Sequence, residues 1–121
     1  MEEDYVSYEV AKLLKEKGFD ESCYQKYDDE GYLSFNHVGY INAEKPTEDF
    51  SALAPTHQMA MKWLREVHNI FIQIELYSKH GDYCFEVFKN THRMIVEKNE
   101  VYNTYEEACE EAIKHVLENL N

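Results

Sequence analysis

Apolar residues recur along this chain with two different periods, which predict where its helices and strands lie. Across residues 57–68 apolar side chains recur every three or four positions, which is typical of a helix with one buried side. Across residues 69–76 they recur at every second position, which is typical of a strand with one buried face. Pro55 disfavours helix before Thr56, whose hydroxyl can cap the first turn. We therefore predict a helix that runs into a strand with almost no linker.

The core should form where this helix lies across this strand. Burying each large apolar side chain is worth about 1.5–3 kcal/mol, so the richest apolar faces should pair. The helix contributes an apolar stripe, and the strand contributes four branched side chains on one face: Ala60, Trp63, Leu64, Val67, Ile70, Ile72, Ile74 and Leu76. The other face of the strand carries Phe71, Gln73 and Tyr77, which that core would leave uncovered.

Two further helices have clear sequence signals at their ends. The first begins after Ser7, which can accept a hydrogen bond from a first-turn amide, and ends at Gly18, which can adopt the left-handed conformation. The last begins at Thr104, in the sequence Thr-Tyr-Glu-Glu, which is a capping box. Both segments have an apolar face and a charged face, so we expect both to pack on a sheet.

Short apolar segments between turn residues predict the remaining strands. Residues 23–27 and 32–35 flank an Asp-Asp-Glu-Gly turn and should form a hairpin. Residues 83–89 and 92–98 should follow the strand at 70–76 through short turns, which makes an antiparallel meander. We also expect a short extended piece at residues 39–42 and a surface loop at 43–50.

The predicted order of elements is α-β-β-α-β-β-β-α, which indicates an α+β fold. The strands should form a mostly antiparallel sheet, made of a hairpin and a three-stranded meander, with the helices packed on one face. The length of 121 residues suits a single domain that spans residues 1–121. Phe88 should share the uncovered face with Phe71, Gln73 and Tyr77.

The net charge of −12 excludes some classes of partner. Residues 1–53 hold 13 acidic and 5 basic side chains, whereas residues 54–100 hold six of each. A surface without a basic patch cannot release counterions from nucleic acid phosphates, so we expect no direct nucleic acid binding. No apolar run approaches the roughly 20 residues that span a bilayer, so we expect no membrane association.

Cysteine and histidine could supply enzyme chemistry, but their spacing does not favour it. The three cysteines, Cys23, Cys84 and Cys109, form no Cys-x-x-Cys pair, and their odd number points to a reducing compartment such as the cytoplasm. The six histidines have none of the usual zinc-ligand spacings. We therefore predict no cofactor, no metal site and no catalytic residue, and an enzymatic role is not expected.

Ten tyrosines make an unusually high share for a chain of this length. Tyrosine is common at core edges, where the ring is buried and the hydroxyl contacts water, and it is equally common in protein interfaces. Acidic side chains are interleaved with the tyrosines of residues 24–40, which would suit a basic protein partner. The candidate interface combines these tyrosines with the uncovered sheet face: Tyr24, Tyr27, Tyr32, Tyr40, Phe71, Gln73, Tyr77 and Phe88.

Three segments carry a resemblance to known proteins: Tyr-Val-Ser-Tyr-Glu-Val-Ala-Lys-Leu-Leu-Lys-Glu-Lys-Gly-Phe-Asp at 5–20, Ala-Pro-Thr-His-Gln-Met-Ala-Met-Lys-Trp-Leu-Arg-Glu-Val-His at 54–68, and Thr-Tyr-Glu-Glu-Ala at 104–108. In these segments and their order the chain resembles small proteins of gut Bacteroidetes and their phages or other mobile elements. No activity is established for that group, so no catalytic residue is carried over. The resemblance implies an intracellular accessory role linked to phages.

We therefore expect a small, cytoplasmic protein-interaction or structural accessory module that binds a protein partner or self-associates as a homodimer. One alternative is an acidic decoy that occupies a basic nucleic-acid-binding protein, since residues 1–53 and the last helix are acidic. A further alternative is a Cys/His enzyme, which would need a cleft that brings histidine, cysteine and carboxylate groups together.

Overall fold

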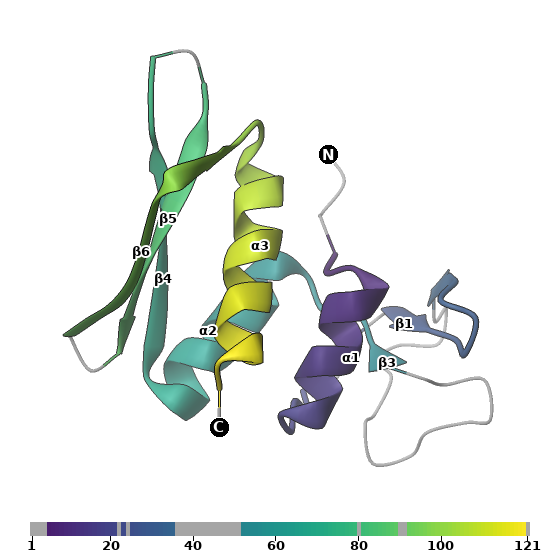
Figure 1. Ribbon diagram of the computed structural model, residues 1–121. Coiled ribbons are helices and arrows are strands. Elements are labelled where there is room, and N and C mark those ends of the chain that lie inside the picture. Colours follow the sequence, from purple (N-terminus) through teal and green to yellow (C-terminus); the bar gives the residue numbers. More distant parts are fainter. Residues whose placement is uncertain are drawn as a thin grey trace. The chain divides into compact units, whose positions relative to one another are not determined.

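A computed structural model describes residues 5–21, 23, 25–35, 52–79, 81–89 and 92–120, and of residues 34, 35 and 92–100 only the backbone (Figure 1). The chain divides into two compact units, Met1–Thr56 and His57–Asn121, each of which we describe by itself. The single domain expected for residues 1–121 stays a prediction.

The order of elements confirms the α+β fold. The described elements are α1 (Tyr8–Glu16), β1 (Gln25–Tyr27), β2 (Leu33–Phe35), β3 (Ala52–Leu53), α2 (His57–His68), β4 (Ile70–Leu76), β5 (Tyr83–Lys89), β6 (His92–Tyr102) and α3 (Tyr105–Glu118). All strand pairs among these elements are antiparallel. The predicted hairpin and three-stranded meander are both present.

In the first unit, α1 begins and ends as its sequence predicts. The Ser7 hydroxyl accepts a hydrogen bond from the Val10 amide at 3.2 Å. At the other end Gly18 has φ +90°, and the Phe19 amide donates to the Leu14 carbonyl at 2.9 Å. This is a Schellman ending, in which Phe19 and Leu14 are both buried.

The strands form two sheets in the described part of the chain, rather than the one sheet that we expected. β1 and β2 form the predicted hairpin, but β1 also pairs with β3, so the first sheet has the order β2-β1-β3. The meander forms the second sheet, with the order β4-β5-β6. The sequence pattern did not predict β3, and the expected extended piece and loop at 39–50 lie outside the described residues.

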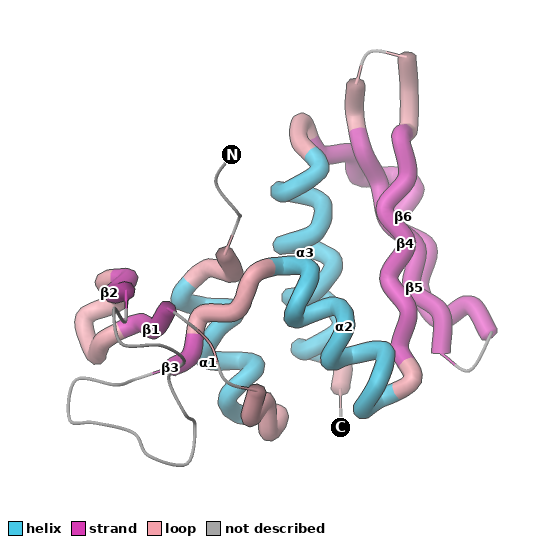
Figure 2. Tube along the Cα trace, turned by 180° about the vertical axis from the view of Figure 1, so that it is seen from behind, coloured by secondary structure: helices cyan, strands magenta, loops and turns pink. Residues whose placement is uncertain are grey.

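In the second unit, α2 and α3 lie on the same side of the meander (Figures 1 and 2). The register pairs Ile72 with Val87 and Ile74 with Phe85, so these four side chains share the helix-facing side of the sheet. Phe85 and Val87 on the central strand are each 1% exposed. The helices bury their apolar faces against this side: Ala60, Met61, Trp63, Leu64, Ala108, Cys109, Ala112, Ile113, Val116 and Leu117.

The link from α2 to β4 is the single residue Asn69, whose φ of +57° ends the helix. The helix begins at His57 and the strand begins at Ile70, as predicted. The expectation that Val67 is buried was wrong, because its side chain is 57% exposed. Val67 lies on the same side of the helix as the buried Ala60 and Trp63, but in the last turn of α2, where its side chain is left without cover.

The last helix confirms its predicted start, because the Thr104 hydroxyl accepts a hydrogen bond from the Glu107 amide at 3.0 Å. Ala108 and Ala112 are fully buried, and their small side chains let α3 approach β5 closely. Among the helices that the structure describes, none has the length and apolar character needed to cross a lipid bilayer.

Candidate interaction surface

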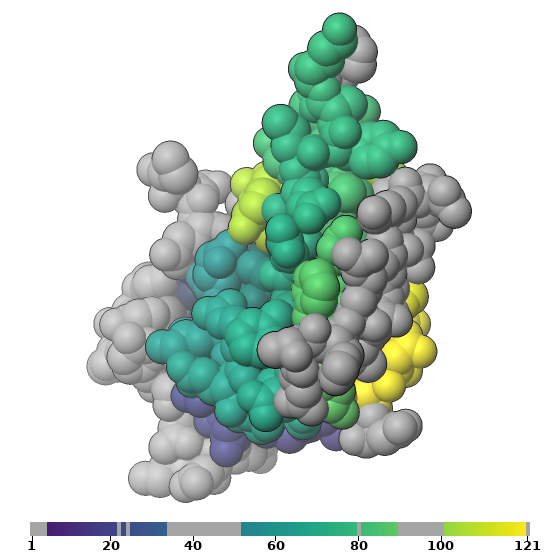
Figure 3. Space-filling model, turned by 90° about the vertical axis from the view of Figure 1, so that its left-hand side faces the viewer, coloured from purple at the N-terminus to yellow at the C-terminus, as the bar shows by residue number. Residues whose placement is uncertain are grey.

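The side of the meander away from the helices is the strongest candidate for a binding surface. Its described strand residues, which we call the outer face, are Phe71, Gln73, Glu75, Cys84, Glu86 and Phe88. The β4 side chains Phe71 and Gln73 are exposed there (Figure 3), Phe88 on β5 is half-buried, and Cys84 and Glu86 on β5 are buried. The outer face holds the predicted residues Phe71, Gln73 and Phe88 together on two paired strands.

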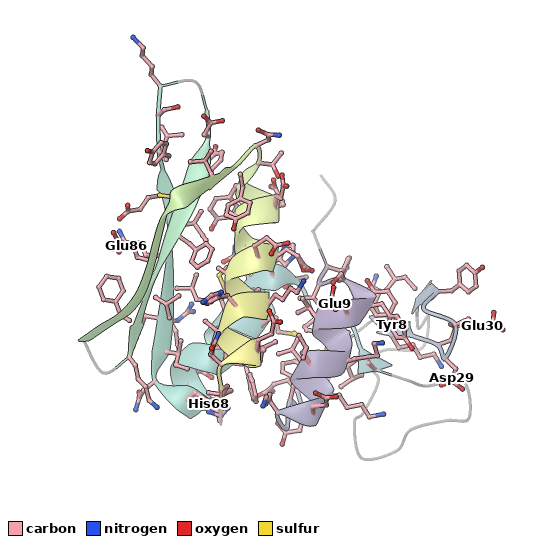
Figure 4. The ribbon with its side chains drawn as sticks, viewed as in Figure 1. Tyr8, Glu9, Asp29, Glu30, His68 and Glu86 are labelled. Carbon is pink, nitrogen blue, oxygen red and sulfur yellow. The ribbon has the colours of Figure 1, made fainter. Side chains whose placement is uncertain are left out.

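The outer face is aromatic at one end and polar in the middle. Phe71 lies opposite Phe88, and Phe71 is 43% exposed while Phe88 is half-buried. Gln73 lies opposite Glu86, and its Nε2 donates to Glu75 Oε1 at 3.0 Å. Glu86 projects from β5 on the side away from α3 (Figure 4) and is only 6% exposed. The accessible part of the outer face is therefore an aromatic pair beside Gln73 and the half-buried Glu75.

The end of β4 adds two exposed apolar side chains. Leu76 is 62% exposed and Tyr77 is 54% exposed. Their position is fixed by the turn that follows, in which the Tyr77 amide donates to the Asp82 carbonyl at 2.7 Å. Tyr77 is thus available as predicted, whereas Leu76 was expected in the core and is not buried. β4 lies at the edge of its sheet, so its distal end projects beyond the cover that the helices supply.

The predicted tyrosine cluster of the first unit does not form among the described residues. Tyr27 is 9% exposed, and its hydroxyl donates to the Val6 carbonyl at 2.6 Å. Its ring also packs at 5.4 Å from the Tyr8 ring. Tyr27 is therefore a core side chain and cannot offer its ring to a partner, so we remove it from the candidate interface.

Tyr32 differs, because it follows the hairpin turn and is 67% exposed. The turn is held by Asp28, whose Oδ1 accepts hydrogen bonds from the Glu30 and Tyr32 amides, each at 2.9 Å. Tyr24 and Tyr40 lie outside the described residues. Of the four tyrosines, Tyr32 alone is shown at the surface in the described part of the chain.

The cysteines are poorly placed for nucleophilic chemistry. All three are free and buried. Burial, with the nearby Glu21 carboxylate as a lesser cause, raises the pKa of the Cys23 thiol to about 12. The thiolate is the reactive form, so Cys23 stays protonated and inert at neutral pH.

The second unit also contains a buried histidine without a hydrogen bond on one ring nitrogen. His57 is 7% exposed, and its Nε2 lies 3.6 Å from Glu110 Oε2. That separation suits an ion pair if the imidazole is protonated, but it is too long for a hydrogen bond. Within the described ranges no three His, Cys, Asp or Glu side chains are grouped so that they could hold a metal ion.

Comparisons with protein-family models, with curated proteins and with solved structures found no match to this chain.

Proposed function

We propose that this protein is a small interaction module, which binds a basic protein segment with apolar side chains on the outer face of its meander. The observation that carries this proposal is the aromatic pair on the outer face, in which Phe71 is 43% exposed and lies opposite the half-buried Phe88. Aromatic side chains are enriched at protein interfaces, where they contribute most of the binding energy.

Charge supports a basic partner. Residues 54–100 are neutral as a whole, but the accessible charged residue of the outer face is acidic, since Glu75 lies beside Gln73 there. A negative field attracts a cationic segment and speeds its association, and salt weakens this attraction. The aromatic pair would then hold the apolar side chains of that segment. Binding of this kind should be salt-dependent without being abolished by salt.

The proposed role is accessory and cytoplasmic. Three free cysteines are consistent with a reducing compartment. The resemblance to proteins of gut Bacteroidetes and their mobile elements suggests a partner in such a host or in its phages. The acidic decoy remains the alternative that the acidity of residues 1–53 and of α3 suggests, but α3 does not present an unbroken acidic surface. Lys114 lies between Glu111 and Glu118, which interrupts any continuous row of carboxylates.

The test compares three forms of the protein as bait in a lysate of a gut Bacteroidetes species, followed by direct titration of each captured protein after purification. The forms are wild type, Phe71→Asp and the matched control Tyr32→Asp, which places the same charge at an exposed aromatic position in the other unit. We expect a basic protein that binds wild type and Tyr32→Asp alike, and that binds Phe71→Asp at least about tenfold more weakly, which corresponds to about 1.4 kcal/mol.

Unfolding curves of both variants serve as the folding control. Phe71 and Tyr32 are both exposed, so neither variant should shift the unfolding midpoint by much. The proposal fails if the captured proteins bind all three forms equally, or if binding does not weaken as the salt concentration rises.

A further inference from the structure

β4 is an edge strand with one unpaired flank. In the order β4-β5-β6 one side of β4 pairs with β5, and the other side faces no strand in the described part of the chain. An edge strand presents a row of backbone donors and acceptors to which another strand can pair. Proteins usually protect such an edge with lysine, proline or a bulge, and Ile70–Leu76 contains none of the three.

The side chains of β4 are complementary to those of a second, antiparallel β4. If the two-fold axis passes through Ile74, Ile72 lies opposite Leu76 of the second copy on the helix-facing side. On the outer face, Gln73 lies opposite Glu75 of the second copy. Phe71 then lies opposite Tyr77 of the second copy. Each cross-strand pair joins aliphatic with aliphatic, amide with carboxylate, or aromatic with aromatic, and such pairs stabilise antiparallel strands.

The neighbouring registers are less favourable. An axis through Gln73 places Phe71 opposite Glu75, which pairs an aromatic ring with a charge. An axis through Glu75 places the two Glu75 carboxylates opposite each other, and like charges there are destabilising. The register through Ile74 also brings three exposed apolar side chains of this edge beside apolar neighbours, since Phe71, Leu76 and Tyr77 are 43%, 62% and 54% exposed.

We propose that two copies of this protein pair antiparallel along β4, with the two-fold axis at Ile74, and form one continuous six-stranded sheet. This interface uses the edge of the meander, whereas the proposed function uses its outer face, and Phe71 takes part in both surfaces. Pairing would place two outer faces side by side and double the surface available to a partner.

The first test is the molar mass in solution, measured by sedimentation equilibrium over a range of concentrations. We expect wild type to approach twice the monomer mass of 14.4 kDa as its concentration rises. Leu76→Lys should weaken association by at least about tenfold, because it places a charge opposite Ile72 of the second copy. Tyr32→Lys, a matched change at an exposed residue of the other unit, should associate like wild type.

The second test reads the register. Three variants, each with one cysteine introduced at position 73, 74 or 75, are oxidised in air. The native cysteines are buried, so wild type measures the background cross-linking. Only a residue on the two-fold axis meets its own copy at the Cα separation of about 4.4–6.8 Å that a disulfide requires. We therefore expect Ile74→Cys to form a disulfide-linked dimer at least about tenfold faster than the other two.

A wild-type mass that stays at the monomer value at every concentration would overturn the proposal, as would faster cross-linking at position 73 or 75. Equal association of Leu76→Lys and wild type would also overturn it. These results are distinguishable from failure of the proposed function, because molar mass and cross-linking are measured on the protein alone, whereas partner binding is measured by titration. Phe71→Asp is scored in both measurements, since Phe71 lies opposite Tyr77 of the second copy.

Discussion

Replacing Phe85 with alanine should lower the free energy of unfolding by about 3–5 kcal/mol. Phe85 lies on the central strand of the meander and is 1% exposed. Its ring stacks on Tyr102 at a centroid distance of 6.2 Å and lies 6.1 Å from the His115 ring of α3. Truncation would leave a cavity between sheet and helix that these neighbours cannot close. Urea unfolding, followed by the fluorescence of the buried Trp63, measures the change.

Phe71 provides the matched control for Phe85. Both residues are phenylalanines of the same sheet, but they lie on opposite faces, and Phe71 is 43% exposed. Phe71→Ala should lower the free energy of unfolding by about 1 kcal/mol or less, since its ring already contacts water. Equal losses for the two substitutions would mean that the two faces of the meander are buried alike.

Replacing Gly31 with alanine should lower the free energy of unfolding by about 2–4 kcal/mol. Gly31 has φ +86°, and a Cβ there would lie 2.9 Å from Cδ2 of Tyr8. The Tyr8 ring has little room to move, because it packs against Tyr27, and the Lys12 ammonium lies 4.5 Å from its centroid. Urea unfolding followed by near-ultraviolet circular dichroism measures the loss.

A substitution at Gly18 distinguishes the two causes of that loss, which are the left-handed backbone and the contact with Tyr8. The φ of Gly18, +90°, is close to that of Gly31, but a Cβ at this position would meet nothing within 4 Å. Gly18→Ala should therefore cost only the left-handed backbone penalty of about 1–2 kcal/mol. If both substitutions cost the same, the contact between Gly31 and Tyr8 does not exist in solution.

Elements with both a strong period and clear end signals could be predicted from the sequence. The bounds of α2, β4 and β5 coincide with the predicted segments, and the caps of α1 and α3 at Ser7 and Thr104 are confirmed. Alternation also placed Phe71, Gln73 and Phe88 on one face of the meander, as the register shows. Their binding role stays a prediction.

Features that depend on how far neighbouring elements extend could not be predicted. A period tells which side of an element a residue occupies, but it does not tell where the covering helix stops. Val67 and Leu76 were therefore expected in the core and are exposed. β3 has two residues, too few to show a period. The short hairpin pattern did not show which side Tyr27 faces. In the structure its hydroxyl donates to the Val6 carbonyl, so the ring points into the core.

Hydroxyl-radical footprinting of the folded protein tests the central claim most directly, which is that the helices cover one face of the meander and that β4 exposes its aromatic residue Phe71 on the other face. Aromatic side chains oxidise at rates that follow their exposure to water, so Phe71 and Tyr77 should be modified readily. Phe85 and Trp63, which are 1% and 3% exposed, should be protected until the protein is unfolded. Protection of Phe71 equal to that of Phe85 would show that the outer face is covered in the folded chain, and would contradict its role as a binding surface.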